Sequence, residues 1–323
     1  MKIKEKTLEI LENKQGEFVS GEEIAKTLGA TRNSVWKAVN SLKAEGYDII
    51  SQSNVGYMLS SNEDIFSSNR IERLCKHDID VLLLDDADSS NNVSKIMASN
   101  GAKEGTVVVV KKQSAGKGRL GRSFISNEEN GLYMSIILRP KLPIEKSVNI
   151  TVIGAVATLE AIEATTGKDC SIKWVNDIFL NDKKVCGILT EASFDFESES
   201  LEYAVLGIGV NVCKPKNGFA PEINDIATAI FDSCAPIGYK SRLCATIIDN
   251  LLDYYNDIGN SNYIKKYREK SNLIGKEVAV YRGNDIINGT VSDIDNEANL
   301  VVQTENGTVK FNSGEARVRK NEK

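Results

Sequence analysis

The apolar residues of this 323-residue chain change their spacing twice, and these changes divide the chain into three segments. Residues 1–61 follow a helical period and end in a short alternating stretch, whereas residues 78–270 alternate apolar β-like runs with helical ones. From 272 to 323 only short strands remain, punctuated by Gly-Asn, Asn-Gly and Asn-Glu turns. A chain of this length has room for three domains, and a polar linker over about 60–77 would join the first two.

The first segment predicts a winged helix-turn-helix. Ser20 with Glu23 forms a capping-box pattern for the middle helix, and Gly29 suits the end of that helix. The following helix is expected to begin at Thr31 and to end at Gly46. It would bury an apolar stripe, flanked by Trp36 and Ala38, that consists of Val35, Val39 and Leu42. The stretch YDIISQSNVGYMLS then alternates around a turn and forms a two-stranded wing.

In this arrangement the last helix enters the major groove of DNA. Its exposed N-terminal face would present the DNA-binding residues Arg32, Asn33, Ser34 and Lys37. The acidic and basic side chains of the segment nearly cancel, so a small helical interaction domain is the alternative. The net charge of −5 argues against a protein that coats nucleic acid indiscriminately, but it leaves room for a small reader domain.

The second and third segments predict an α+β multidomain protein. Six apolar runs between residues 80 and 212 are expected strands, and SVNITVIGAVATLEAIEATTG and SRLCATIIDNLLDYYND are expected helices. Several of these runs follow one another without an intervening helix, which indicates a mixed α/β domain with a largely hairpin-connected sheet. The short strands after residue 272 suggest a small five-stranded barrel of SH3-like type.

Cysteine and histidine usage limits the possible chemistry. The six cysteines are scattered without a C-x-x-C pair, and His77 is the single histidine, so we expect no metal site and no histidine-based nucleophilic catalysis. No stretch approaches the roughly 20 apolar residues of a membrane helix. The charged N-terminus has no signal-peptide core, and these features predict a cytoplasmic protein without a membrane partner.

The stretch GKGRLG, residues 116–121, matches the G-x-G-x-x-G pattern of dinucleotide-binding turns. Such a turn needs a helix that opens on its last glycine, and here Gly121 leads into a polar loop and another strand. The Rossmann interpretation therefore fails. The surrounding run KKQSAGKGRLGR carries five basic residues and no acidic one, and its glycines free the backbone to wrap around an anion. A solvated surface loop and a nucleic-acid contact are the alternatives.

A second cluster favours the anion-binding interpretation. The stretch KWVNDIFLNDKKVCGILTE passes through Asn176–Asp177, turns tightly, and returns with Lys183 and Lys184 ahead of the bare backbone of Gly187. In LGIGVNV, Gly207 and Gly209 lie in a strand, where glycine usually marks the close approach of a ligand or of another backbone. Each of these features alone is also common in purely structural roles.

Taken together, the motifs resemble one family. DSSN (88–91), GKGRLGR (116–122), KWVND (173–177), KKVCGILTE (183–191) and GIGVN (207–211) occur in the order and spacing of biotin protein ligases. With the winged helix in front and the barrel behind, the chain is similar to the bifunctional form, which is both biotin–[acetyl-CoA-carboxylase] ligase and biotin operon repressor. Three positions depart from the family pattern, namely Lys117 for arginine, Val175 for proline and Phe124 for tryptophan.

This resemblance implies two half-reactions. Biotin and MgATP give biotinyl-5′-AMP and pyrophosphate, and a lysine of a biotin carboxyl carrier protein then takes the biotinyl group and releases AMP. The implied catalytic residues are Lys184 and Arg119. The implied biotin-binding residues are Ser89, Ser90, Asn91, Gln113, Gly116, Lys117, Arg119, Lys184 and Gly187. The implied nucleotide-binding residues are Arg119, Arg122, Phe124, Asn176, Asp177 and Asn211, and Glu315 would tie the C-terminal barrel to the site.

The resemblance also implies regulation. Biotinyl-5′-AMP would favour a homodimer whose two winged helices match an inverted-repeat operator of biotin genes. The same surface would dock the carrier, so that the enzyme and repressor states compete. Three other functions stay open at this point: a lipoate–protein ligase, a transcription factor that only senses a small molecule, and a ligase without operator binding.

Overall fold

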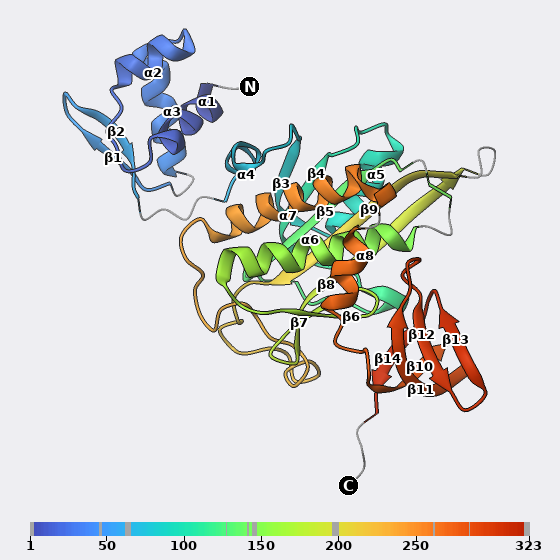
Figure 1. The fold of residues 1–323 in the computed structure, drawn as a ribbon. Helices are drawn as coiled ribbons and strands as arrows, with labels where there is room; N and C mark the ends of the chain where they lie inside the picture. Colours follow the sequence, from blue (N-terminus) through green and yellow to red (C-terminus); the bar gives the residue numbers. More distant parts are fainter. Residues whose placement is uncertain are drawn as a thin grey trace. The chain divides into compact units, whose positions relative to one another are not determined.

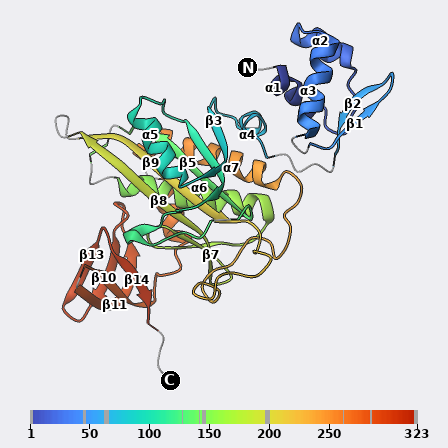
Figure 2. The ribbon, with the colours of Figure 1, turned by 180° about the vertical axis from the view of Figure 1, so that it is seen from behind.

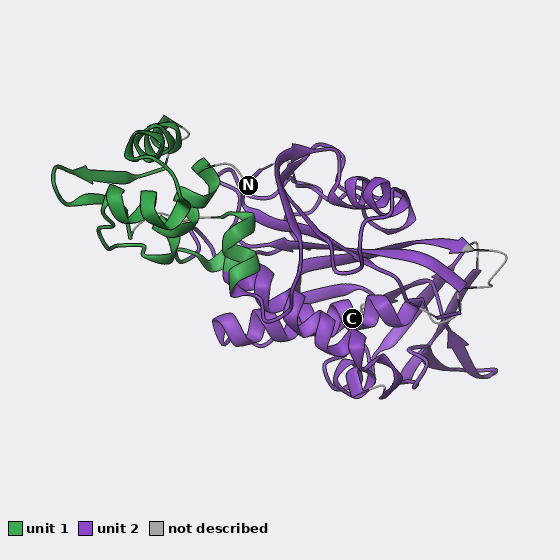
Figure 3. Ribbon diagram, turned by 90° about the horizontal axis from the view of Figure 1, so that it is seen from above, with its two compact units in different colours: residues 1–73, 236–241 green, residues 74–235, 242–323 purple. Residues whose placement is uncertain are grey.

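The structure, a computed structural model, describes residues 3–44, 47–61, 66–126, 128–140, 142–143, 147–195, 200–260, 262–283 and 285–319. The chain divides into two compact units (Figure 3). The first contains residues 1–73 with 236–241, and the second contains residues 74–235 with 242–323.

The first unit has the helices and the wing that the sequence predicts (Figure 1). Its elements are α1 (Ile3–Asn13), α2 (Gly21–Leu28), α3 (Arg32–Ala44), β1 (Ile49–Gln52) and β2 (Gly56–Leu59). A buried cluster that includes Leu11, Ile24, Val35, Leu42 and Leu59 packs them together.

Local capping sets the helix boundaries in this unit. The Ser20 side chain accepts a hydrogen bond from the N–H of Glu23, and Gly29 ends α2 at a left-handed φ of 60°. The carboxylate of Glu23 binds Lys14, so the reciprocal half of the expected capping box is replaced by an ion pair. Thr31 caps α3 through the N–H of Ser34. The expected stop at Gly46 lies outside the described residues.

The segment expected as a plain polar linker contains a short helix, α4 (Ser68–Leu74). The side chain of Ser67 caps this helix by accepting a hydrogen bond from the N–H of Arg70, and Ile71 is fully buried. One cap and one buried aliphatic residue stabilise this turn of helix, although the segment is polar overall.

The second unit contains a mixed sheet whose strand order, within the described residues, is β3-β4-β5-β9-β8-β7-β6. These strands are Val81–Ala87, Val107–Gln113, Gly131–Leu138, Ser200–Asn211, Lys183–Asp195, Asp177–Leu180 and Ser171–Lys173. Only the β3–β4 pair among them is parallel, which agrees with the predicted hairpin-connected sheet. The crossover between β3 and β4 contains α5 (Ser90–Ser99), a helix that the sequence reasoning missed.

Helices cover both faces of this sheet (Figures 1 and 2). Two neighbouring residues of β9 show this directly, because side chains alternate between the faces of a strand. Leu206 lies against Gly154 of α6 (Val148–Thr166), whereas the bare Gly207 lies against Asn91 of α5. Helix α6 is long and apolar enough in composition to cross a membrane, but two thirds of its most apolar stretch are buried in this domain. It is a core helix, and α7 (Tyr239–Asn256) follows the sheet in the chain.

The C-terminal part follows α8 (Asn262–Glu269), the third helix, after α4 and α5, that sequence reasoning missed. Its described strands form an antiparallel sheet of order β13-β12-β11-β10-β14. The strands are Gly307–Phe311, Leu300–Thr304, Asp285–Ile294, Glu277–Arg282 and Glu315–Val318. The predicted fold class, an N-terminal helix-turn-helix, a central mixed α/β domain and a small C-terminal β domain, is confirmed.

Candidate active site

The candidate site lies on the α5 face of the central sheet, where two glycines of β9 leave the backbone bare. A Cβ atom at Gly207 would stand 2.0 Å from Oδ1 of Asn91, and one at Gly209 would stand 2.8 Å from the ring of Phe124. Neither separation is tolerated by real atoms, so both positions require glycine in this conformation. The cavity here is lined by Ser89, Ser90, Asn91, Gln113, Lys117, Gly118, Arg119, Phe124, Asn176, Lys184, Gly187, Ile188, Leu189, Gly207, Ile208 and Gly209.

Buried polar side chains at the start of α5 form one end of the cavity. Oε1 of Gln113 accepts a 2.7 Å hydrogen bond from the N–H of Ser90, and Nε2 of Gln113 donates to Ser126. Oγ of Ser135 lies 2.7 Å from Oγ of Ser90 and 2.6 Å from Oδ1 of Asn91. These mutual hydrogen bonds fix the orientation of each donor and acceptor, which is what recognition of a small polar ring requires.

The glycine-rich loop, residues 114–124, is closed by its own backbone. Gly118 N–H donates to Arg122 C=O at 2.7 Å, and Phe124 N–H donates to Gly116 C=O at 2.9 Å. A Cβ at Gly116 would stand 2.4 Å from the carbonyl oxygen of Phe124, so this glycine allows the loop to fold back on itself. Lys117 reaches across and donates to Oδ1 of Asn92 on α5 at 2.6 Å.

Phe124 and Lys184 lie over the bare strands. The Phe124 ring contacts Tyr133 edge to face, with 6.3 Å between the ring centroids, and the Lys184 side chain passes over Gly187. The resulting cavity measures about 50 Å³. Sites for drug-sized ligands enclose roughly 300–1,000 Å³, so side chains that lie over the strands, such as Phe124 and Lys184, must shift before such a ligand fits.

Two arginines of the loop reach different partners. Arg119 donates to Oδ1 of Asn176 at 3.2 Å and to the carbonyl oxygen of Gly314 at 3.3 Å. Burial lowers the pKa of Arg119, and the nearby Asp177 carboxylate opposes that shift. Arginine stays protonated at any pH that matters here, so a fixed positive charge is held half-buried at the cavity.

Arg122 points away from the cavity to Glu315 of β14, at 2.5 Å. Burial alone would raise the pKa of Glu315, but hydrogen bonds from Arg317 and Arg122 outweigh burial and lower this pKa to about 2. The glycine-rich loop is thus fastened to the C-terminal sheet by an ion pair, which agrees with the tie expected at Glu315.

A second cation approaches the cavity from β8. Nζ of Lys184 lies 2.7 Å from Oδ1 of Asp177 on β7, and this buried oxygen has no hydrogen-bond partner within the described residues. The contact is therefore an ion pair that holds the ammonium group of Lys184 beside the cavity.

The structure brings most of the predicted site residues together. Among the residues expected in the site, Gly116, Arg122, Asp177 and Asn211 do not line the cavity. Asn211 instead donates to the carbonyl oxygen of Thr228 at 3.0 Å and holds a neighbouring loop. Sequence reasoning missed Leu189, whose side chain shares the site face of the sheet with Gly187, Gly207 and Gly209. Ile188 and Ile208 border the cavity, but they alternate onto the α6 face of the sheet.

The predicted DNA-reading face is also formed, on α3. Arg32, Asn33 and Lys37 are exposed, whereas Ser34 is half-buried with its hydroxyl 2.8 Å from that of Thr31. Trp36, which we expected beside the buried stripe, is 54% exposed and shares this face. A large exposed aromatic side chain between cations is suited to contact bases or sugars.

Comparisons with known proteins agree with these features. Three family models match: Biotin/lipoate A/B protein ligase family over residues 86–211, HTH domain over residues 4–58, and Biotin protein ligase C terminal domain over residues 273–319. Among solved structures, Biotin protein ligase from Aquifex aeolicus in complex with biotin and ATP superposes with a TM-score of 0.60 at 27% identity. That match covers 75% of this chain and 99% of the other.

Curated relatives match over nearly the whole length. Bifunctional ligase/repressor BirA of Bacillus spizizenii is 34% identical over 322 residues, covering 97% of this chain and 98% of the relative. Bifunctional ligase/repressor BirA of Bacillus subtilis gives the same identity and coverage. The chain therefore belongs to the family of bifunctional biotin ligase/repressor proteins.

Proposed function

We propose that this protein is an ATP-dependent biotin protein ligase that also represses transcription of biotin genes. The observation that carries the proposal is the convergence of two cations, Arg119 and Lys184, on a cavity whose floor is cleared by Gly207 and Gly209. Family membership over 97% of the chain supports the same conclusion.

The cavity suits biotin in both of its halves. The fused ring of biotin has a polar ureido edge, which matches the buried donors and acceptors around Ser90, Asn91 and Gln113. Its aliphatic tail would lie over the bare backbone of Gly187 and Gly209, beside Leu189, and lead toward Lys184. The carboxylate at the end of the tail would therefore meet the cations.

In the first half-reaction a biotin carboxylate oxygen attacks the α-phosphorus of ATP, and the bond from that phosphorus to the bridging oxygen of pyrophosphate breaks. Two anions must approach each other, and negative charge grows on the departing pyrophosphate. Lys184 and Arg119 would offset this charge, because both are held at the cavity before the substrates react. Such groups need little reorganisation in the transition state.

Mg²⁺ would enter bound to ATP. No group of three or more potential metal ligands is found in the described parts of the chain, which suits an ion carried mainly by substrate phosphates. The buried Oδ1 of Asp177, whose sole close partner in the described region is Lys184, is the carboxylate oxygen best placed to reach such an ion. Asn176, which accepts a hydrogen bond from Arg119, would complete the nucleotide side.

In the second half-reaction the ε-amine of a carrier lysine attacks the carbonyl carbon of the mixed anhydride, and AMP leaves with the bonding electrons. The intermediate hydrolyses if water reaches it first, so the glycine-rich loop must stay closed until the carrier arrives. Two contacts hold this loop in place. Lys117 donates a hydrogen bond to Asn92, and Arg122 forms an ion pair with Glu315.

The deciding experiment is biotin-dependent exchange of labelled pyrophosphate into ATP, with lipoate as the parallel substrate. Exchange with biotin alone supports the proposal. Exchange with lipoate alone moves the protein to lipoate ligation, and silence with both leaves a transcription factor that only senses a small molecule.

Repression forms the second half of the proposal. The exposed Arg32, Asn33 and Lys37 of α3 would read the operator, and biotinyl-5′-AMP would favour the homodimer that places two such helices on an inverted repeat. Carrier, nucleotide substrates and operator all lie in the bacterial cytoplasm, where we place the protein. Sedimentation with and without biotin plus ATP tests the dimer, and an unchanged oligomeric state would leave a ligase without this switch.

A further inference from the structure

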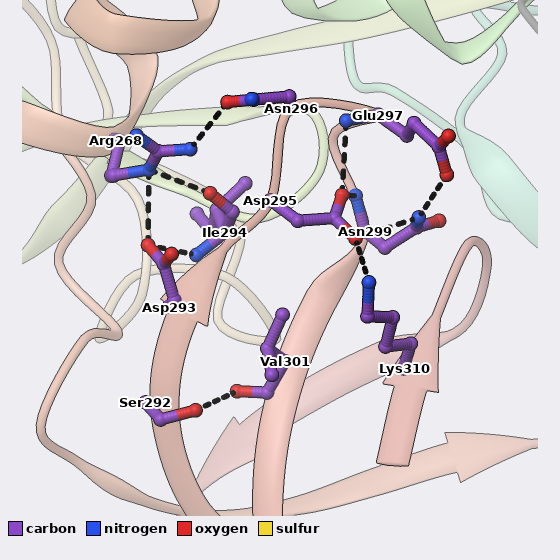
Figure 4. A network of polar contacts seen from close by, with 10 residues as sticks. All are labelled: Arg268, Ser292, Asp293, Ile294, Asp295, Asn296, Glu297, Asn299, Val301 and Lys310. Atoms are coloured by element: carbon purple, nitrogen blue, oxygen red, sulfur yellow. Dashed lines mark hydrogen bonds and ion pairs between the residues drawn. The ribbon is translucent and has the colours of Figure 1, made fainter. Parts of the chain in front are cut away.

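The C-terminal sheet contacts two segments of the candidate active site at separate points. These segments are the glycine-rich loop, residues 114–124, and the KWVND stretch, residues 173–177. The first is the contact of Gly314 and Glu315 with the arginines of the glycine-rich loop. The second is made by the turn between β11 and β12, residues 293–299, and has no part in the function described so far. Figure 4 shows this turn with its polar contacts.

The turn is rigid because its own side chains hold it. The Asp295 carboxylate accepts hydrogen bonds from the backbone N–H groups of Glu297 and Asn299, at 3.0 and 2.9 Å, and pairs with Lys310 at 2.9 Å. Ala298 is fully buried at a φ of 63°, a left-handed conformation that costs energy for a residue with a Cβ. Its carbonyl group is therefore held in one direction by the surrounding network.

Helix α8 clamps this turn to the central domain. Arg268 donates through Nε to the carbonyl oxygen of Ile294 at 2.6 Å and lies 3.0 Å from Oδ1 of Asp293. Nη2 of Arg268 donates to Oδ1 of Asn296 at 3.0 Å. The preceding residue, Tyr267, is buried and donates to the carbonyl oxygen of Val175 at 2.9 Å. Consecutive residues of one helix therefore hold both the turn and the KWVND stretch (173–177).

A buried hydrogen bond joins these two parts. Nε1 of Trp174 donates to the carbonyl oxygen of Ala298 at 2.9 Å, and Trp174 is 3% exposed. Trp174 stands two residues before Asn176, which binds Arg119, and three before Asp177, which pairs with Lys184. The indole group therefore ties the polar end of this stretch to a rigid point on the C-terminal sheet.

We propose that the 293–299 turn is a positioning element for the nucleotide side of the active site, acting through Trp174. The turn fixes the indole, the indole fixes the backbone of residues 174–177, and this backbone places Asn176 and Asp177 opposite Arg119 and Lys184. The C-terminal sheet thus sets the distance between the KWVND stretch and the glycine-rich loop. It binds the first through Ala298 and the second through Gly314 and Glu315. This inference rests on the proposed function, in which those side chains serve ATP.

A fastening role alone makes a different prediction. If the turn only holds the C-terminal sheet in place, its loss lowers the thermal stability and leaves the kinetic constants of the folded enzyme unchanged. If it positions Asn176 and Asp177, the KM for ATP rises while the KM for biotin does not. The groups expected to bind the biotin ring, on α5 and β4, are held by hydrogen bonds of their own such as that from Ser90 N–H to Gln113, whereas the turn holds Trp174.

The experiment uses the full chain with Trp174→Phe, which keeps a buried ring but removes the N–H, and with Arg268→Ala, which releases the turn. Arg268 is about one third exposed, so its loss leaves the core intact even where Trp174→Phe disturbs folding. Lys266→Ala is the matched control, because this neighbour on α8 pairs with Glu160 at 3.1 Å and touches no part of the turn. Thermal melting verifies that each variant is folded.

Biotin-dependent pyrophosphate exchange is then measured at varied ATP and varied biotin. We expect both variants to raise the KM for ATP about fivefold to tenfold, the scale of one lost buried hydrogen bond, with the KM for biotin within twofold of wild type. Lys266→Ala should match the wild type. Unchanged KM values for ATP in folded, active Trp174→Phe and Arg268→Ala would overturn the inference, and so would equal rises for both substrates. An inactive wild type would refute the proposed function instead.

Discussion

Nζ of Lys184 lies 2.7 Å from Oδ1 of Asp177, whereas the adjacent Lys183 donates to the carbonyl oxygen of Asn224 outside the cavity. Two neighbouring lysines of one strand therefore face different surroundings. We expect Lys184→Ala to slow biotin-dependent pyrophosphate exchange by about 100-fold or more, the usual scale for losing one charge-stabilising group.

Lys183→Ala is the matched control and should retain nearly full exchange activity. A loss below about tenfold for Lys184→Ala, or an equal loss for Lys183→Ala, would show that the wrong lysine has been chosen.

Arg119→Gly should convert the enzyme into one that loses its intermediate. Arg119 joins the glycine-rich loop to Asn176 and to Gly314, so its removal frees the loop that covers the adenylate. We expect biotinyl-5′-AMP to dissociate faster and to label bystander lysines, measured as streptavidin-detected biotin on added albumin. Lys112→Ala, which removes the loop-flanking cation that pairs with Glu129, should cause no such labelling. A normal dissociation rate in Arg119→Gly would mean that the loop does not retain the adenylate.

Gly209→Ala should damage the site without unfolding the domain. The added methyl group would stand 2.8 Å from the Phe124 ring, which must move away from the bare strand. We expect kcat/KM for biotin in the exchange assay to fall by about tenfold or more, with the melting temperature nearly unchanged. Gly259→Ala, at a site with open space around the added atom, is the control. Wild-type kinetics in Gly209→Ala would show that the floor of the cavity tolerates a side chain.

The Glu315 ion pairs predict a specific pH dependence of stability. The folded-state pKa of Glu315 is lowered to about 2, against an ordinary value of 4.5, so its stabilising contribution is present above pH 4.5 and is lost as the pH falls toward 2. Both arginine partners are more than half exposed, which limits this contribution to about 1 kcal/mol. Urea unfolding of wild type and Glu315→Gln should differ at pH 7 and converge near pH 2. A constant difference across this range would contradict the pairing.

Trp36 and Lys37 should act on operator DNA in different ways. Lys37→Ala is expected to weaken binding and to reduce the slope of log K against log salt by about one, as for one lost phosphate contact. Trp36→Ala should weaken binding with no change in that slope, because the indole carries no charge. Lys6→Ala on α1 serves as a control for surface charge. Equal salt slopes for Lys37→Ala and wild type would place α3 away from the phosphates.

Much of the fold is predictable because most elements carry a clear hydrophobic period. Helix α6 and six strands of the central sheet read directly from their apolar residues, whereas β7 (Asp177–Leu180) was not among the expected runs. Helix α5 does not, because the side that it buries consists of Ser90, Asn91, Ser94 and Ala98. Polar and small residues replace the usual apolar stripe here, and two of them, Ser90 and Asn91, also line the site. The demands of the site therefore account for part of the missing apolar signal of this helix.

The site was predictable as a set of motifs but not as a set of contacts. An anion site needs a bare backbone and a positive charge. Glycines and lysines supply these locally, so the sequence alone shows them. The hydrogen bond from Trp174 to Ala298 joins residues 124 apart, and neither residue has a local feature that names its partner. Trp36 was expected beside the buried stripe because it neighbours Val35 in the sequence, but its side chain is 54% exposed. The buried side of α3 is occupied by Val35, Val39 and Leu42, which leaves no room there for the Trp36 side chain.

The cavity of about 50 Å³ has a consequence for the order of events in time. A protein whose resting cavity is smaller than its ligand can hold that ligand only while the lining side chains stand apart. The observed association rate for biotin should then level off at high concentration, at the frequency of this expansion, instead of rising linearly. Apparent affinity is reduced by the fraction of time spent in the expanded form. The contraction that slows entry also delays escape of a reactive anhydride, so slow capture and long retention have one origin.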